Sequence, residues 1–153
     1  MEPGIREFDG FVYQYVGDEI MALFKLQDER YADNAVRAAV AIQDRILTDY
    51  NLRREEKGYE PIRIGVGLNT GPVAIGVAGT SHRMDACAFG STVNLAARCE
   101  ALTKELGASI IMTEHTYRHL SSPDAFESKI WGSRLYGAWS NRFTFRRLVI
   151  LPW

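Results

Sequence analysis

FVYQYVGDEIMALF occupies residues 11–24 and contains two apolar, β-favouring runs on either side of Gly17-Asp18. A Gly-Asp pair between two such runs is a good signal for a two-residue turn, so this segment predicts a β-hairpin. Asp18 is therefore expected at an exposed strand tip.

Two segments predict long helices. The first, AVRAAVAIQDRIL at residues 35–47, has apolar residues at helical spacing on one broad face, and we expect it to end near residues 53–57. The second covers residues 91–106 and begins with a plausible Ser91 cap. The apolar face of the first helix consists of Ala35, Val36, Ala39, Val40, Ile42, Ile46 and Leu47.

The remaining segments predict mainly strands. IRIGVGLNTG (residues 62–71) and VAIGVAG (residues 73–79) are typical of two strands joined by Gly71-Pro72, and their glycines suggest close backbone approach. Further elements are a strand at 109–113, a short helix at 114–120, and strands near 126–131 and 143–151. This order predicts one α+β domain over residues 1–153, with helices packed on a mixed sheet.

Composition excludes several classes of protein. The net charge of the 153 residues is -1, so the chain lacks the basic field of a nucleic-acid binder. No apolar run reaches the roughly 20 residues that cross a bilayer, and we expect no membrane contact by this segment. Cys87 and Cys99 lie in different predicted elements and make a poor disulfide framework, which favours a reducing, cytoplasmic location.

Other nucleotide and metal motifs do not fit. Gly65, Gly67 and Gly71 lack the spacing of a dinucleotide fingerprint, and no P-loop pattern occurs. His115 and His119 are four residues apart but have no third ligand nearby in the sequence, so a solvated helix face is favoured over a metal site.

Three separated segments share one resemblance: YVGDEIMALF (15–24), IRIGVGLNTGPVAIGVAG (62–79) and AFGSTVNLAARCE (88–100). Together they resemble the catalytic domain of the class III adenylate and guanylate cyclases. The resemblance implies a ferredoxin-like α+β fold with a mixed, mostly antiparallel sheet. It also implies a head-to-tail homodimer that binds ATP or GTP between its protomers, with Mg²⁺ or Mn²⁺ as cofactor. The expected products are a 3′,5′-cyclic monophosphate and pyrophosphate. Members are usually fused to sensor or membrane segments, which is compatible with a larger or membrane-attached protein.

The resemblance also implies roles for individual residues. Asp18 matches a metal-binding aspartate, although a Gly-Asp pair is by itself only a common turn. Asn94 and Arg98 lie four apart on one helix face. By resemblance Asn94 orients the ribose, and Arg98 donates hydrogen bonds to charge that builds on the α-phosphate.

Four residues are implied to contact the rest of the substrate. Gln14 and Cys87 occupy the base-selecting positions, and their identities lie between the adenine-reading and guanine-reading patterns, with a slight lean towards guanine or loose selectivity. A packing role is the alternative for Cys87, and Cys99 is expected to be a packing residue alone. Arg142, five residues after Gly137, falls where the family has a phosphate-gripping lysine, with surface charge as an equal alternative. Arg83 is a weaker candidate for that role.

The chain departs from the family pattern at its start. The family carries a first metal-binding aspartate on an opening strand that a helix follows, but only 17 residues precede Asp18 here, and Asp9 does not align with that ligand. We therefore expect a domain truncated at its N-terminus that lacks the usual first strand and helix. Three interpretations remain open: a fragment of a longer cyclase, a non-catalytic module for dimerisation or nucleotide sensing, and an incomplete domain whose missing strand is supplied by a symmetry partner or left open.

Overall fold

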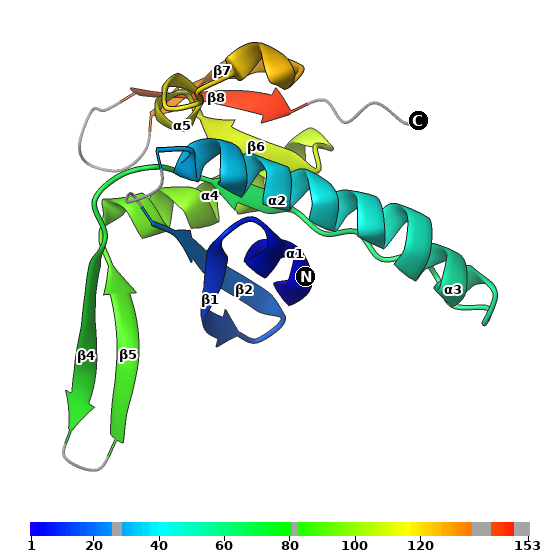
Figure 1. Cartoon of the computed structure of the whole chain (residues 1–153), viewed down its shortest axis with the longest axis horizontal. Coiled ribbons are helices and arrows are strands. Elements are labelled where there is room, and N and C mark those ends of the chain that lie inside the picture. Colours follow the sequence, from blue (N-terminus) through cyan, green and yellow to red (C-terminus); the bar gives the residue numbers. More distant parts are fainter. Residues whose placement is uncertain (26–28, 81–82, 136–141, 149–153) are drawn as a thin grey trace.

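The computed structural model describes residues 1–25, 29–80, 83–135 and 142–148 (Figure 1). Its fold is α+β, as predicted. A short helix α1 (Glu2–Glu7), which the sequence did not predict, precedes an antiparallel hairpin of β1 (Gly10–Val16) and β2 (Glu19–Phe24). The turn between these strands uses Gly17 in a left-handed conformation (φ 62°), which glycine adopts without a steric penalty. The hairpin prediction is thus confirmed.

The first long helix continues through three segments: α2 (Tyr31–Arg45), a π-helical turn η1 (Ile46–Tyr50) and α3 (Asn51–Glu55). It ends close to the predicted position. Val36, Ala39 and Ile42 on its predicted apolar face are buried, but Leu47 is 55% exposed. Leu47, on the same predicted apolar face, is not buried because the end of this helical rod extends away from the sheet (Figure 1).

The larger sheet has the strand order β3-β6-β8-β7. Strand β3 (Val66–Leu68) runs parallel to β6 (Ile110–Thr113), while β8 (Arg142–Leu148) is antiparallel to both β6 and β7 (Ser128–Leu135). Helix α5 (Glu114–Arg118) and a 3-10 turn η2 (Pro123–Ala125) connect β6 to β7. These strands and α5 lie where the sequence predicts them, apart from shifts of a few residues at their ends, whereas η2 was not predicted.

The segment after Gly71-Pro72 forms a separate hairpin. Strand β4 (Ala74–Thr80) pairs with β5 (Arg83–Phe89), a strand that the sequence analysis did not predict. We call β4 and β5 together the β4–β5 arm, since they project from the body of the domain (Figure 1). Within the described residues, β1–β2, β4–β5 and the four-stranded sheet are three separate sheets.

Strand β6 lies at the centre of the core because its four residues are buried on both faces. Ile110 and Met112 pack against α2, and Ile111 packs against α4 (Ser91–Leu106). Successive side chains of a strand point to opposite faces, so the two helices cover opposite sides of this strand. In the part of the chain described here, no helix has the length and apolar character needed to span a membrane.

Candidate functional site

Helix α4 carries the two predicted catalytic side chains. Leu95, Cys99 and Leu102 are buried against the sheet, whereas Asn94 and Arg98 are exposed one helical turn apart. The helix has the predicted bounds, but its N-cap is Gly90 and no side chain caps it, so the predicted Ser91 cap was wrong. Gly90 replaces it because the chain leaves β5 with a φ of 143°, a conformation that favours glycine.

Close backbone contact fixes α4 on β3. A Cβ atom at Gly67 would stand 2.2 Å from the carbonyl oxygen of Ala96 and 2.3 Å from the amide nitrogen of Glu100. A Cβ atom at Gly65 would stand 2.0 Å from the hydroxyl of Thr103. The expectation of close approach at these glycines is therefore confirmed, and it sets the distance between the sheet and the helix that bears Asn94 and Arg98.

The β1–β2 hairpin places Asp18 and Gln14. Asp18 is exposed at the turn, as predicted. The register of the hairpin shifts between Val12 and Gln14, so Tyr13 is the extra residue of a β-bulge, and partly buried Gln14 pairs with Met21. Bulges often re-aim side chains next to active sites. Sequence periodicity alone did not reveal this one.

Electrostatics connect the hairpin tip with α4. Burial raises the pKa of the Glu100 carboxyl, and the negative charges of Glu19 and Asp18 raise it further. The carboxylates at the tip of the hairpin thus lie close enough to α4 to influence the ionisation of Glu100. Glu100 was not predicted as part of this region, although it follows Arg98 by two residues.

The carboxylates near the hairpin tip determine how a divalent metal ion could bind to this region. Among the described residues, no group of three or more His, Cys, Asp or Glu side chains could hold a metal ion. Mg²⁺ is commonly bound through one or two carboxylates together with substrate phosphates, rather than by an all-protein cage. The exposed Asp18, in a region of negative charge, fits a metal that arrives with a triphosphate.

Three other predicted residues are placed only by their backbones, because their side chains lie outside the described part of the structure. Arg142 begins β8, opposite Leu135. Cys87 pairs with Gly76 within the β4–β5 arm. Arg83 pairs with Thr80 at the far end of the arm, roughly 20 Å along the strand from Phe89 at about 3.3 Å per residue. One protomer therefore does not bring Arg83 close to α4.

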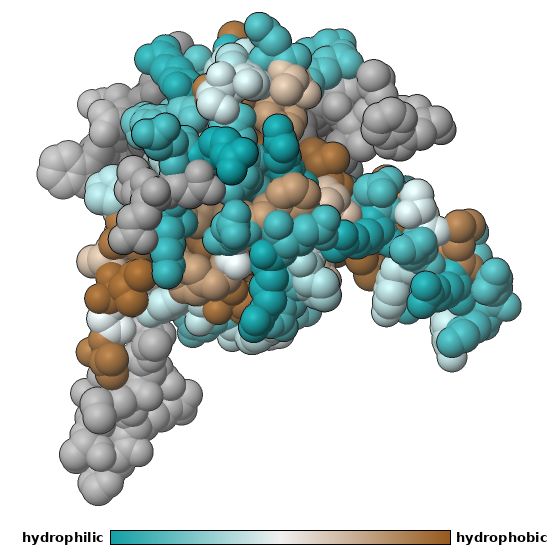
Figure 2. Space-filling model, in the orientation of Figure 1, coloured by the Kyte–Doolittle hydropathy of each residue, from teal (hydrophilic) through white to brown (hydrophobic). Residues whose placement is uncertain are grey.

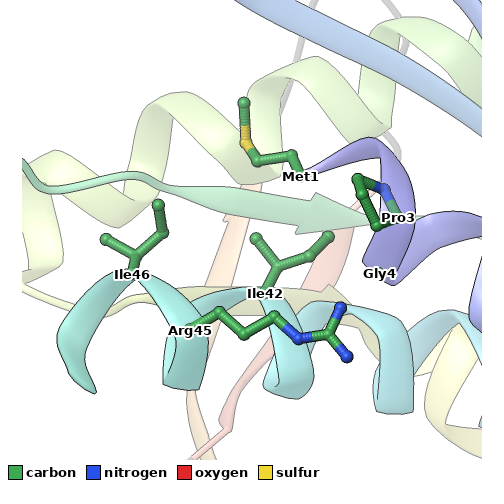
Figure 3. Close-up of a pocket in the computed structure, with 6 residues that line it drawn as sticks. All are labelled: Met1, Pro3, Gly4, Ile42, Arg45 and Ile46. Atoms are coloured by element: carbon green, nitrogen blue, oxygen red, sulfur yellow. The ribbon is translucent and has the colours of Figure 1, made fainter. Parts of the chain in front are cut away.

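A small cavity lies away from these residues. It measures about 80 Å³ and is lined by residues of the N-terminal segment and of the helical rod, as Figure 3 shows. Ligand pockets usually measure about 300–1,000 Å³, so this space is too small for a nucleotide. None of the predicted site residues lines it. Its lining residues are Met1, Pro3, Gly4, Ile42, Arg45 and Ile46.

The β4–β5 arm exposes apolar side chains. Ile75 is 59% exposed, Val77 is 68% exposed and Phe89 is 51% exposed. Figure 2 shows brown, hydrophobic atoms near the base of the arm, where it leaves the body of the domain. Contiguous exposed apolar surface is typical of an interaction site.

The family is decided by a comparison with known proteins. The model of the adenylate and guanylate cyclase catalytic domain matches residues 6–134 of this chain. The chain belongs to this family. The match includes the β1–β2 hairpin, the helical rod, the β4–β5 arm and α4, and therefore covers Gln14, Asp18, Asn94 and Arg98.

Individual members of the cyclase family are also similar. An adenylate cyclase of Anabaena cylindrica is 36% identical over 133 residues, which are 85% of this chain but only 26% of that protein. The adenylyl cyclase CyaB from P. aeruginosa matches 98% of this chain and 76% of its own with a TM-score of 0.80 at 24% identity. The guanylyl cyclase Cya2 gives a TM-score of 0.77 at 23% identity, over 95% of this chain and 73% of its own. These similarities do not support the non-catalytic interpretation.

Proposed function

We propose that this cyclase domain converts a purine nucleoside triphosphate, ATP or GTP, into its 3′,5′-cyclic monophosphate for intracellular signalling. The ribose 3′-oxygen forms a bond to the α-phosphorus, the bond from that phosphorus to the bridging oxygen breaks, and pyrophosphate leaves. The hydroxyl proton is lost to solvent. The observation that carries this proposal is the family match over residues 6–134, which contains Asn94 and Arg98 on an exposed face of α4.

Asn94 and Arg98 act on different parts of the nucleotide. The amide of Asn94 offers a donor and an acceptor to the ribose, which holds the 3′-hydroxyl near the α-phosphate. The guanidinium of Arg98, one turn along the same face, donates hydrogen bonds to the charge that develops on the α-phosphate oxygens. Because the backbone of α4 lies directly on β3, these two groups share a rigid support.

Asp18 would hold the Mg²⁺ or Mn²⁺ ion on the triphosphate. A bound divalent cation lowers the pKa of the attacking hydroxyl and offsets phosphate charge. The turn around Gly17 presents the Asp18 carboxylate to solvent at the end of two paired strands, where an incoming metal-nucleotide complex can reach it. Arg142 is proposed to contact the terminal phosphates, with Arg83 as the weaker candidate.

A homodimer is proposed because one protomer presents its site residues on exposed surfaces. Asp18 lies at a strand tip, and Asn94 and Arg98 lie on the outer face of α4. The β4–β5 arm, with exposed Ile75 and Val77, offers an apolar surface that a second copy can cover. A head-to-tail arrangement would then complete each site between two protomers.

Base selection is assigned to Gln14 and Cys87. The Gln14 amide can donate or accept a hydrogen bond, whereas a thiol is a weak donor that offers little to the amino group of adenine. We therefore propose guanine preference or loose selectivity. Gln14→Glu should favour GTP further, because a carboxylate accepts from the ring N–H and amino group of guanine.

The test is cyclic AMP and cyclic GMP formation from ATP or GTP with Mn²⁺, in the wild type and two arginine variants. Arg98→Ala should lower kcat by about 10²- to 10³-fold, as does the loss of one donor to a transition-state oxyanion. Arg37→Ala is the matched control, because Arg37 is also exposed on a long helix, α2, but has no proposed role. Circular dichroism would show whether both variants fold.

The outcomes separate the interpretations. Turnover that collapses only in Arg98→Ala supports the proposal and shows that the family's first metal-binding aspartate is dispensable in this chain. Triphosphate binding without turnover in the wild type, even with Mn²⁺, would instead favour a nucleotide-sensing module. Equal turnover in Arg98→Ala and Arg37→Ala would overturn the role given to Arg98.

A further inference from the structure

Asn69, which follows β3 directly, links the sheet to the first turn of α4. Its Nδ2 donates a hydrogen bond of 3.0 Å to the backbone carbonyl of Thr92, the second residue of the helix. Its Oδ1 accepts a hydrogen bond of 2.8 Å from the hydroxyl of Thr113, the last residue of β6. A single amide therefore connects the ends of β3 and β6 with the helix that carries Asn94.

The Thr113 end of this connection is buried and fixed. Thr113 and Thr116 are each 2% exposed, their hydroxyls lie 3.1 Å apart, and the amide of Thr116 donates to the Thr113 hydroxyl. Buried polar groups with all partners satisfied are rigid, because breaking one contact leaves others unpaired. Asn69 is thus anchored to the most buried strand of the domain.

Thr92, at the helix end of this connection, is also restrained by a second hydrogen bond. The Thr92 hydroxyl donates 2.7 Å to the carbonyl of Pro72, so the first turn of α4 is also tied to the segment that leads into the β4–β5 arm. Gly71 has a φ of 158°, and a Cβ atom there would stand 2.6 Å from the Thr92 hydroxyl. The backbone of Gly71 therefore lies directly against the Thr92 side chain in this first turn.

Helix α4 lacks a side-chain cap at its N-terminus, where the cap residue is Gly90. The first turn of such a helix frays unless other contacts hold it. The hydrogen bond from Asn69 to the Thr92 carbonyl restrains this first turn from outside the helix. Asn94 lies two residues beyond Thr92 and Arg98 one turn further, so a tilt of this turn displaces both.

We propose that Asn69 is a positioning residue, which sets Asn94 and Arg98 for the transition state by holding the first turn of α4 through Thr92. This inference rests on the cyclase activity proposed above. Asn69 does not touch the nucleotide in this scheme, so its loss should affect kcat more than substrate binding. Misplacement of catalytic groups by about 1 Å can cost as much as 10²-fold in rate.

The test uses Asn69→Ala, with Asn51→Ala as a matched control. Asn51 also makes two hydrogen bonds through its amide, to the carbonyl and the N–H of Ile62, but these lie at the far end of the helical rod. Both variants lose the same kind of contacts, so a general loss of stability affects both. Asn69→Asp keeps the acceptor for the Thr113 hydroxyl and removes the donor to the Thr92 carbonyl. This variant therefore tests the hydrogen bond to Thr92 separately from the one to Thr113.

Expected results are a fall in kcat of about 10- to 100-fold for Asn69→Ala and Asn69→Asp, with KM within about twofold of the wild type. Asn51→Ala should keep the wild-type kcat. Amide hydrogen exchange at residues 94–96 should accelerate in both Asn69 variants and stay unchanged in Asn51→Ala.

Two outcomes would overturn the inference. One is unchanged exchange at residues 94–96 in the Asn69 variants, a result that counts even if the wild type shows no turnover. The other is wild-type kcat in Asn69→Ala under conditions where Arg98→Ala is inactive. Equal turnover in Arg98→Ala and wild type would instead contradict the proposed catalytic role, which makes the two failures distinguishable.

Discussion

The backbone of Gly67 in β3 lies against the carbonyl oxygen of Ala96 in α4, at a distance that leaves no room for a side chain. Gly67→Ala would place its methyl group 2.2 Å from that oxygen, so sheet and helix must separate. We expect the free energy of unfolding to fall by about 1–3 kcal/mol, the usual cost of overpacking, as measured by urea denaturation. Gly76→Ala is the control, because no atom lies within 4 Å of its added Cβ, and its stability should change little.

Dimerisation should depend on the β4–β5 arm. Val77→Lys puts a charge on apolar surface that a second protomer is proposed to cover, and burying an unpaired charge is unfavourable. We expect the dimer to dissociate at concentrations where the wild type is dimeric, as measured by analytical ultracentrifugation. Ile130→Lys on β7 is the control, since Ile130 is 61% exposed but lies outside the arm. A wild-type association constant for Val77→Lys would contradict the arm as the interface.

Metal dependence should reside in Asp18. Asp18→Asn removes the charge of the proposed ligand, so the Mn²⁺ concentration for half-maximal activity should rise at least about tenfold. Asp9→Asn, a change of the same kind just before the hairpin, should leave that concentration unaltered. Calorimetric titration of Mn²⁺ in the presence of a non-hydrolysable triphosphate measures the same difference without turnover. Equal metal affinity in both variants would exclude Asp18 as the ligand.

A partly buried ion pair should make stability depend on pH. Arg146 donates through Nε to Glu114 at 2.6 Å, and its guanidinium lies 3.6 Å from the ring centre of Tyr117. The hydrogen bond from Arg146 lowers the pKa of the Glu114 carboxyl below its usual 4.5. A carboxyl with a depressed pKa in the folded state stabilises the protein above its unfolded-state pKa, and this stabilisation is lost as the pH falls through the folded-state value.

Glu114→Gln should therefore lower the free energy of unfolding by about 1.5–3 kcal/mol at pH 7, the range for hydrogen bonds to charged groups. The difference from the wild type should shrink as the pH falls below 4.5, the ordinary pKa of the carboxyl. Urea unfolding at several pH values measures this. Glu127→Gln changes an exposed carboxyl and serves as the control. A loss that is equal at every pH would show that the charge of Glu114 contributes nothing.

Cys99 should resist alkylation in the folded protein. Its side chain is fully buried, and burial raises the pKa of its thiol to about 12. The thiolate is the reactive form, so iodoacetamide at pH 8 should leave Cys99 unmodified in the native state and modify it in urea. Mass spectrometry of the digested protein gives the extent of labelling at each cysteine. Rapid native labelling of Cys99 would contradict its packing between α4 and the sheet.

Local sequence signals determined most of the elements. The hairpin at 11–24 follows from two apolar runs around a Gly-Asp turn, and α4 follows from helical periodicity between residues 91 and 106. These signals are local, since strand alternation and helix periodicity act over a few residues. The same motifs gave the family resemblance, with Asp18, Asn94 and Arg98 as its implied site residues. Elements without a strong local pattern, such as α1 and β5, were not predicted.

The tertiary structure alone decided how these pieces meet. Nothing in the sequence of β4 indicates that it leaves β3 and pairs with β5, because strand pairing depends on partners distant in the chain. The exposure of Leu47 and the connection from Asn69 to Thr92 and Thr113 depend in the same way on where the sheet ends and which residues lie opposite. The sequence therefore indicated which residues to propose for the site, and the packing of β3 against α4 determined where Asn94 and Arg98 lie, since only three-dimensional contacts fix the position of a helix on a sheet.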